Sequence, residues 1–359
     1  MHRSVLALCG LLAIACCAPA RAAARVPASF FGVMADGPLL GGAPDVDLGA
    51  ELRLMRSSGA GSVRLAVYWS DVQPRAGVLD WSSVDRFMAA AVAARLDVLP
   101  VVLRTPAWAA ANPSDPASPP GDPATYAAFL RALIGRYGPH GTFWPANASL
   151  PRRPVREWQV WNEPDITKYW SVPGAWAPGY VRLLRAAHSA IRRADPHAKV
   201  VLAGLTNRSW IDLRRVYAAG GRRLFDVAAA HPFSRRVANV VKIVDLVRKE
   251  MRRHGDARKA LLLTEVSWSS GEGHSTFNYG WETTERGQAA RVRAALTALA
   301  ARRARDRIAG LYWYTWLSPA IGGADSFDYG GLRRLDGAGR SVSKPALAAF
   351  RATARRLER

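Results

Sequence analysis

Two glutamates each follow a short apolar run, and their type and position suit acid–base chemistry. Glu163 follows Asn162 and precedes Pro164, so the residues before it read as a strand that stops at the proline. Pro164 also favours an extended backbone at Glu163. Glu265 ends the apolar run 260–264 in the same way. Both carboxyls are therefore expected at the ends of strands.

A pair of carboxyls of this kind can cleave a glycosidic bond. One carboxyl must carry a proton for the leaving oxygen, and the other must be ionised to attack or stabilise the sugar carbon. Their surroundings must hold the two pKa values apart, and burial against tryptophan would raise one of them. A lone glutamate such as Glu51 or Glu285 is instead interpreted as a surface charge or an ion-pair partner.

The elements that must position this pair alternate along the chain. Short β-branched or apolar runs read as strands, and stretches rich in Ala, Leu and Arg with helical periodicity separate them. Strands are expected at 30–35, 62–68, 97–103, 157–161, 200–205, 227–231, 260–265 and 308–316. Helices are expected at 48–58, 81–94, 124–137, 177–194, 211–219, 239–254, 285–305 and 343–357.

Eight strand–helix pairs predict an α/β fold, a single (β/α)₈ TIM barrel, with a loop or short hairpin at 321–340 after the last strand. In such a barrel the fourth and seventh strands lie across the mouth from each other. Glu163 and Glu265 can then flank one bound sugar despite their separation in sequence.

Residues 161–164, Trp-Asn-Glu-Pro, resemble the strand-four signature of glycoside hydrolase clan A. Residues 264–265, Thr-Glu, resemble the strand-seven nucleophile of the same clan. The similarity spans residues 30–350 and is nearest to bacterial members of families 39 and 5, which include β-xylosidases, endoglucanases and hydrolases of bacterial exopolysaccharides.

The resemblance implies a role for each of these residues. Glu163 would be the general acid/base, Glu265 the nucleophile, and Asn162 a contact to the sugar 2-hydroxyl. The implied activity is retaining hydrolysis of a β-linked oligo- or polysaccharide through a covalent glycosyl intermediate, with neither a metal nor an organic cofactor.

Arg64 lies inside the apolar strand expected at 62–68, where a charged side chain needs a partner. It matches the clan arginine beneath the nucleophile, where a guanidinium would keep Glu265 ionised and oriented.

His231 ends the strand expected at 227–231 and corresponds to the His-x-Tyr element of the clan. Phe233 departs from that element, because it stands where a tyrosine hydroxyl usually reaches the nucleophile. Tyr279 or Tyr314 can supply this contact from elsewhere in the chain.

Tryptophans are expected to bind sugar faces. The last predicted strand resembles the clan's strand eight, whose tryptophan forms the floor of the site. Strand alternation puts Trp313 and Trp316 on opposite faces, so only one can face the barrel, and Trp316 is expected to do so because it is nearer the rim. Trp108 follows the third strand and is expected to add a sugar subsite.

Residues 1–24 read as an export signal, with a basic start, an apolar run at 5–18 and Ala-x-Ala at 20–22. A secreted catalytic domain of residues 25–359 is expected. All three cysteines precede residue 25, so cleavage would leave no thiol for disulfides or metals. The alternative is a lipoprotein signal that anchors the chain at Cys16.

The formal net charge of +22 comes mainly from arginine. Arginines scattered along helical stretches indicate solvated outer faces, and no aromatic-interleaved basic block predicts a nucleic-acid partner. The charge favours a bacterial exopolysaccharide or cell-wall glycan as the carbohydrate partner. Two rival hypotheses stay open: a non-catalytic carbohydrate-binding barrel, suggested by Phe233, and a basic protein that binds anionic polymers.

Overall fold

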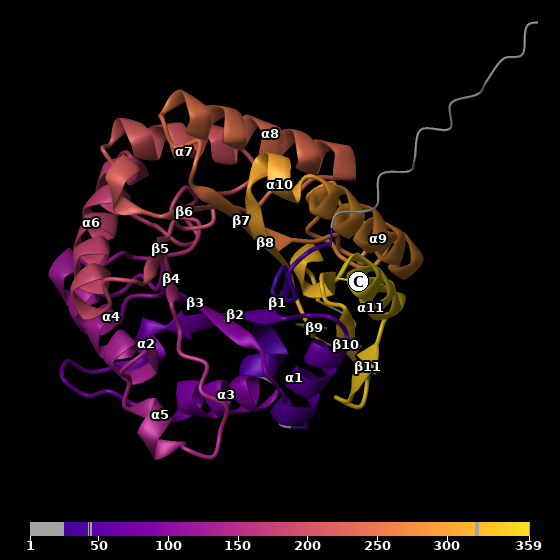
Figure 1. Ribbon diagram of the computed structural model, residues 1–359, viewed down its shortest axis with the longest axis horizontal. Helices are drawn as coiled ribbons and strands as arrows, with labels where there is room; N and C mark the ends of the chain where they lie inside the picture. Colours follow the sequence, from indigo (N-terminus) through magenta and orange to yellow (C-terminus); the bar gives the residue numbers. More distant parts are fainter. Residues whose placement is uncertain (1–24, 42, 44, 320–322, 359) are drawn as a thin grey trace, which may run out of the picture.

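The computed structural model describes residues 25–41, 43, 45–319 and 323–358 of the chain. Eight parallel strands close into a barrel in sequence order, and helices surround it (Figure 1). The strands are β1 (Phe31–Ala35), β2 (Ser62–Tyr68), β3 (Asp97–Leu103), β4 (Glu157–Val160), β5 (Lys199–Val201), β6 (Val227–Ala230), β7 (Ala260–Val266) and β8 (Ile308–Trp313). The predicted single (β/α)₈ barrel is confirmed. The predicted export signal, its cysteines and the anchoring alternative at Cys16 lie outside the described residues.

The helices of the outer layer follow the predicted ranges closely. The long ones are α1 (Leu48–Ser57), α3 (Ser82–Ala93), α4 (Pro123–Tyr137), α6 (Trp176–Ala194), α7 (Ser209–Ala218), α8 (Val237–Arg253), α9 (Glu285–Ala301) and α11 (Pro345–Glu358). Short helices are α2 (Trp69–Val72), α5 (Phe143–Ala146) and α10 (Arg303–Asp306). The helix predicted at 285–305 is thus two helices, α9 and α10.

Side-chain caps fix where several of these helices begin. Asp47 accepts a hydrogen bond from the backbone of Ala50 at the start of α1, and Thr284 accepts one from Gly287 at the start of α9. Asp122 caps α4, whose first residue is Pro123, a position where the missing N–H leaves no hydrogen bond unmade. These helix starts are therefore encoded locally, and α1 and α9 begin at the predicted residues, while α4 begins one residue earlier.

Two apolar layers hold the barrel together. The larger one lies between the strands and the helices. A smaller cluster fills the barrel interior, and its members are Leu99, Val201, Val227, Ala229, Leu262 and Tyr312. Gly32 on β1 makes room for the ring of Tyr312, because a Cβ there would lie 2.4 Å from the ring. The interior is thus a packed core below the mouth of the barrel.

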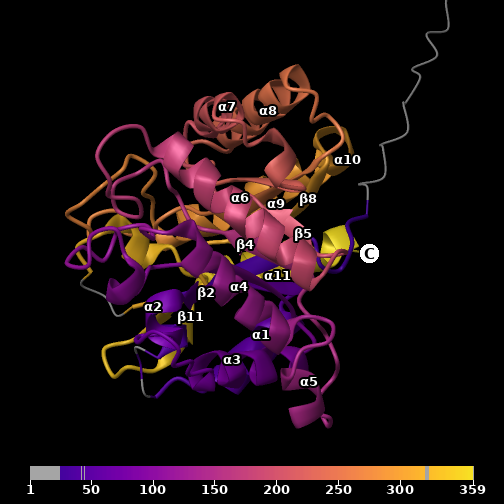
Figure 2. The same ribbon diagram turned by 90° about the vertical axis from the view of Figure 1, so that its left-hand side faces the viewer.

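The two ends of the barrel differ in what they carry. In Figure 2 the loops that follow the strands extend to the left, with α2 after β2 among them, whereas α5, which precedes β4, lies to the right. Functional sites of this fold lie at the carboxyl ends of the strands. The left-hand end in Figure 2 is therefore the end that bears the site.

A small second sheet adjoins the barrel beside α1 (Figure 1). It consists of β9 (Leu317–Ser318), β10 (Arg333–Leu335) and β11 (Ser341–Ser343), of which the last two form an antiparallel hairpin. A loop or short hairpin is predicted at 321–340, and the observed hairpin lies at 333–343, so its second strand follows the predicted range.

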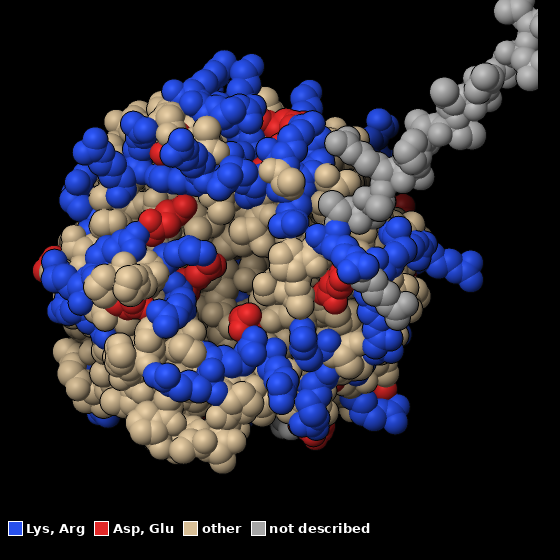
Figure 3. Space-filling view, in the orientation of Figure 1, with Lys and Arg blue, Asp and Glu red and all other residues tan. Residues whose placement is uncertain are grey.

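Basic side chains cover the face opposite the site, which is the face turned toward the viewer in Figures 1 and 3. Figure 3 shows Lys and Arg spread around most of this face, with fewer Asp and Glu among them. This distribution fits the expectation of solvated outer faces and marks no single binding patch. Among the described residues, no helix is both long and apolar enough to span a bilayer.

Candidate active site

The two predicted carboxyls lie together at the carboxyl ends of β4 and β7. One oxygen of Glu163 lies within 4.8 Å of one oxygen of Glu265, and their side chains are only 11% and 8% exposed. The expected extended backbone at Glu163 is wrong, since its φ is 41°. Strand β4 ends at Val160, and beyond it Asn162 still bridges Gly204 in parallel, while Trp161 also has a positive φ, of 69°.

Arg64 connects the polar groups beneath the pair. It is fully buried on β2, and its Nη1 donates to Glu265 Oε1 at 2.7 Å. Its Nη2 donates to Asn162 Oδ1 at 2.7 Å, and its Nε donates to Gln159 Oε1 at 2.7 Å. The predicted contact with Glu265 is present, and the guanidinium also fixes Asn162 so that its amide N–H groups remain available to a ligand.

His231 lies between the two carboxyls and belongs to a second chain of hydrogen bonds. Its Nδ1 is 2.6 Å from Glu163 Oε1 and its Nε2 is 2.9 Å from Thr264 Oγ1. Gln159 donates from Nε2 to the same Thr264 hydroxyl at 3.3 Å and to Leu202 O at 3.1 Å. This arrangement favours a threonine proton directed at Nε2 and an N–H on Nδ1 that donates to Glu163.

The surroundings set the protonation of these groups. Burial raises the pKa of Glu163 to about 7, against the opposing charges of Arg64 and Lys168. Burial also raises the pKa of Glu265, while its contacts with His231 and Arg64 oppose the rise. Burial lowers the pKa of His231 to about 4, so the imidazole is neutral near pH 7. The site thus has one carboxyl poised to exchange a proton and one in direct contact with a cation.

We expect Glu163→Gln to stabilise the fold above pH 7. The carboxyl holds a proton in the folded state up to about pH 7 but loses it near pH 4.5 when unfolded, so stability falls as pH rises between these values. The difference corresponds to about 3 kcal/mol, an upper bound because glutamine changes the contact with His231. Urea denaturation at pH 4 and pH 8 measures this, and an equal effect at both pH values would contradict the raised pKa.

Gly204 gives His231 the space that it occupies. A Cβ at this position would lie 1.9 Å from His231 Nε2, and the carbonyl of Gly204 accepts a hydrogen bond from the Glu163 backbone at 3.1 Å. We expect Gly204→Ala to destabilise the fold by about 1–3 kcal/mol through overpacking. Gly135→Ala is the matched control, because the space around that glycine in α4 is open. Thermal denaturation compares them, and equal melting temperatures would refute the packing argument.

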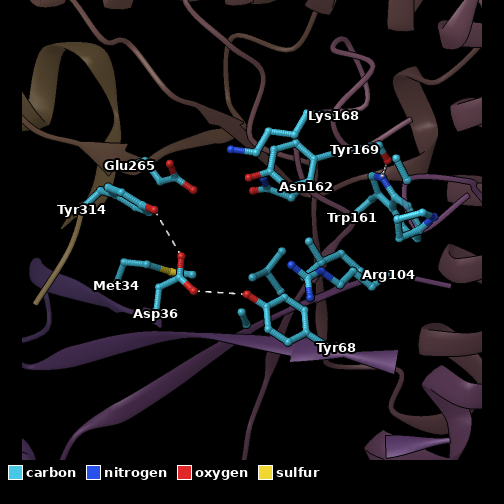
Figure 4. A pocket seen from close by; sticks show the side chains of 15 residues that line it. Met34, Asp36, Tyr68, Arg104, Trp161, Asn162, Lys168, Tyr169, Glu265 and Tyr314 are labelled. Carbon is cyan, nitrogen blue, oxygen red and sulfur yellow. Dashed lines mark hydrogen bonds between the residues drawn. The ribbon is translucent and has the colours of Figure 1, made fainter. Parts of the chain in front are cut away.

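A cavity of about 430 Å³ opens in front of Glu265. Its polar lining combines residues predicted from sequence with others that were not, and Figure 4 shows their side chains directed into it. The members not predicted from sequence are Asp36, Tyr68, Arg104, Lys168 and Tyr169. Tyr314, one of the two tyrosines considered above as a contact to Glu265, also lines the cavity. Asp36 and Arg104 directly follow predicted strands and Tyr68 ends one, whereas Lys168 and Tyr169 lie further along the loop after the fourth predicted strand.

The aromatic residue at the site is Tyr314, which directly follows β8, and the expectation for Trp316 and Trp313 is wrong. Trp316 is fully buried behind the barrel, where its Nε1 donates to Glu51 Oε2 at 2.6 Å. Trp313 is also fully buried and donates to Gly330 O at 2.9 Å. Strand β8 ends at Trp313, so regular alternation does not extend to residues 314–316.

Trp108 and Tyr279 lie outside the cavity lining. Trp108 is 39% exposed and donates to Gln73 O at 2.9 Å, and Tyr279 is 57% exposed and donates to Asp325 Oδ2 at 3.2 Å. Neither therefore joins the carboxyl pair, although both remain exposed aromatic surfaces.

Phe233 occupies an aromatic cluster beside the site. Its ring centroid lies 5.2 Å from that of Phe327 and 6.5 Å from that of Tyr314. Among the described residues, no tyrosine hydroxyl hydrogen-bonds to Glu265, and that of Tyr314 instead donates to Asp36 Oδ2 at 3.2 Å. The departure at Phe233 is thus accommodated by packing, without a substitute hydroxyl on Glu265.

The spacing of Glu163, His231 and Glu265 is also one that a metal ion can use, since their ligand atoms lie within 4.8 Å of one another. Arg64 contacts Glu265 at 2.7 Å, so a divalent cation there would face a buried guanidinium. The arrangement suits proton transfer and attack at an electrophilic carbon better than metal binding.

The fold and the site define a (β/α)₈ barrel with a buried glutamate pair at the ends of β4 and β7. No protein-family model matches the chain, and no curated protein matches it. Solved structures similar to it include a family 39 glycoside hydrolase from Bacteroides cellulosilyticus WH2, at 20% identity and a TM-score of 0.67. That match covers 92% of this chain and 64% of the other, so this chain spans less than two thirds of that protein.

Two further structures show the same likeness. The GH53 catalytic domain of Ignisphaera aggregans is 22% identical, with a TM-score of 0.62 and coverage of 91% of this chain and 97% of the other. A monomeric β-xylosidase from Caulobacter crescentus CB15 is 18% identical, with a TM-score of 0.62 and coverage of 92% and 69%. The predicted resemblance to clan A glycoside hydrolases is confirmed at the level of the fold.

Proposed function

We propose that this protein is a retaining glycoside hydrolase that cleaves β-linked oligo- or polysaccharides. The observation that carries the proposal is the close pair of buried glutamates with different surroundings. Arg64 contacts Glu265, whereas Glu163 contacts neutral His231 and has a pKa of about 7. The similarity of the fold to glycoside hydrolases supports the same class of reaction.

In the first step, a carboxylate oxygen of Glu265 attacks the anomeric carbon. The bond from that carbon to the leaving oxygen breaks, and the leaving oxygen takes the proton of Glu163. Because His231 donates to Oε1 of Glu163, the acidic proton resides on Oε2. A glycosyl ester of Glu265 and an ionised Glu163 result.

In the second step, Glu163 accepts a proton from water while the water oxygen attacks the same carbon. The ester bond breaks, Glu265 leaves as a carboxylate, and Glu163 regains its proton. Retaining enzymes place the carboxyls about 5–5.5 Å apart, whereas inverting enzymes need roughly 6.5–9.5 Å to admit water. One oxygen of each carboxyl lies within 4.8 Å of the other, which fits the closer spacing of retaining enzymes.

Asn162 is proposed to donate a hydrogen bond to the sugar 2-hydroxyl. Arg64 occupies its carbonyl oxygen, which leaves the amide N–H groups for the sugar. Tyr314, which lines the cavity beside Glu265, supplies an aromatic face for the ring in place of the tryptophans. We further propose that the chain is exported and acts on a bacterial exopolysaccharide or cell-wall glycan, as the sequence predicts.

The test is product release from aryl β-glycosides and from bacterial and plant polysaccharides. Proton NMR of the first product should show the β-anomer before it equilibrates. An α-anomer as the first product would contradict retention. Absence of turnover by the folded protein on every substrate would contradict hydrolysis and favour a carbohydrate-binding barrel.

A further inference from the structure

We propose that the cavity accepts a sugar carrying a carboxylate, a uronic acid, and that Arg104 and Lys168 bind this carboxylate. The inference rests on the proposed function, because it names the substrate class of the same site. It is based on the position of two cations that, among the described residues, form no hydrogen bond or ion pair with Glu163 or Glu265.

Arg104 and Lys168 reach the cavity from different elements. Arg104 directly follows β3, and Lys168 lies in the loop after β4, five residues beyond Glu163. Both line the cavity and both are exposed. Among the described residues, neither forms an ion pair, although many other basic side chains of the protein do, such as Arg136 with Asp85. Two cations without an ion-pair partner among the described residues, in a sugar-sized cavity, are available to an anionic ligand.

Acidic and basic side chains enter the cavity from different sides. Figure 4 shows Glu265, Asp36 and Tyr314 on one side, and the charged ends of Lys168 and Arg104 pointing inward from the other. Asp36 is engaged on its own side, because it accepts hydrogen bonds from Tyr68 at 3.1 Å and from Tyr314 at 3.2 Å. A sugar whose anomeric carbon faces Glu265 would therefore present the substituents of its far edge to the two cations.

The arginine is held in place before any ligand binds. Its guanidinium carbon lies 4.1 Å above the ring of Tyr68, and its carbonyl accepts a hydrogen bond from Ser70 at 3.0 Å. Its φ of 60° is in the left-handed region, which a non-glycine residue adopts at an energetic cost and which is often found at functional sites. A planar guanidinium fixed in this way matches the two oxygens of a carboxylate.

General surface charge would not by itself select a sugar. Lys and Arg are also spread over the face opposite the site (Figure 3). A polyanion attracted by that charge alone would bind without discriminating one sugar from another. Arg104 and Lys168 instead lie in the same cavity as Glu265, so they can select the sugar that is cleaved.

The test compares substrates that differ only in the carboxylate. Hydrolysis of a β-linked polysaccharide containing glucuronate is measured beside hydrolysis of its carboxyl-reduced form, in which each uronate is a neutral sugar. Binding of 4-nitrophenyl β-D-glucuronide and of 4-nitrophenyl β-D-glucoside to the Glu265→Gln protein is measured by calorimetry. We expect the acidic member of each pair to be favoured by about 10- to 100-fold, as charge-assisted hydrogen bonds provide.

In the Arg104→Gln/Lys168→Gln double variant, we expect the ratio of acidic to neutral substrate to fall to about one. The matched control is Arg131→Gln/Lys242→Gln, which removes the same two charges from α4 and α8 and should keep the ratio of the wild type. A lower ratio in the control as well would assign the preference to general surface charge and overturn the proposal.

The outcomes separate the two proposals. Turnover of both polysaccharides at equal rates would overturn the uronate site while leaving glycoside hydrolysis intact. Preferential binding of the glucuronide that depends on Arg104 and Lys168, without turnover by the wild type, would support the uronate site and contradict hydrolysis. Equal binding of both aryl glycosides would overturn the uronate site.

Discussion

Replacing Glu265 by glutamine is expected to lower kcat by on the order of 10⁴-fold or more, because the amide cannot form the glycosyl ester. Glutamine retains the size of the side chain and the oxygen that Arg64 contacts, so sugar binding should persist. Initial rates on any substrate that the wild type hydrolyses provide the measurement. Glu285→Gln is the matched control, since that glutamate is 40% exposed and paired with Arg334.

Azide distinguishes loss of a nucleophile from general damage to the site. In Glu265→Ala, azide can enter from the vacated side and displace the leaving group, giving an α-glycosyl azide from a β-glycoside. In Glu163→Ala, azide replaces water in the second step and gives the β-glycosyl azide. The reverse pattern would mean that the two roles are exchanged, and full activity of Glu265→Gln would refute the proposed mechanism.

Arg64→Met is expected to destabilise the fold by about 3–5 kcal/mol, the cost of breaking a buried ion pair by removing one partner. The substitution leaves Glu265, Asn162 and Gln159 each without the hydrogen bond that the guanidinium donates. Urea denaturation measures the change. Arg153→Met, which removes a partly exposed partner of Asp97, is the control and should change stability by about 0–1 kcal/mol.

Arg64 should also determine the position of the acid limb of the pH–rate profile. Arg64 lowers the pKa of Glu265, so its loss lets that pKa rise further, and the ionised carboxylate then persists only at higher pH. The acid limb of kcat/KM should therefore move upward in Arg64→Lys, which keeps a charge but not the three-way contact, and further in Arg64→Met. An unchanged acid limb in the two folded variants would show that Arg64 has only a structural role.

The barrel and the carboxyl pair were predictable from sequence because both depend on local patterns. Apolar runs of strand length alternate with helical periodicity, and a glutamate before proline marks the end of a strand wherever the chain later folds. Arg64 was predictable for a related reason, since a charge within an apolar strand must meet a partner inside the barrel. The structure places it against Glu265.

The aromatic residue that lies at the site after β8 could not be predicted from local patterns. Alternation assigns a face to Trp313 and Trp316 only while the strand continues, and β8 ends at Trp313. Beyond that point, tertiary contacts determine the direction of each side chain. Trp316 hydrogen-bonds to the buried Glu51, which lies 265 residues earlier in the chain. Arg104 and Lys168 were missed because exposed basic residues are common in this sequence, and only their place in the cavity distinguishes them.

The contact between Trp316 and Glu51 lies near the seam where β8 pairs with β1. Another contact joins the ends of the described chain, since the backbone of Val26 donates to Leu357 at 3.0 Å. A nascent chain emerging from the ribosome cannot make either contact until its final segment is synthesised. Until β8 is synthesised, β1 and β7 are open edges that invite pairing with other chains. Premature termination before β8 should therefore yield aggregation rather than a smaller working barrel.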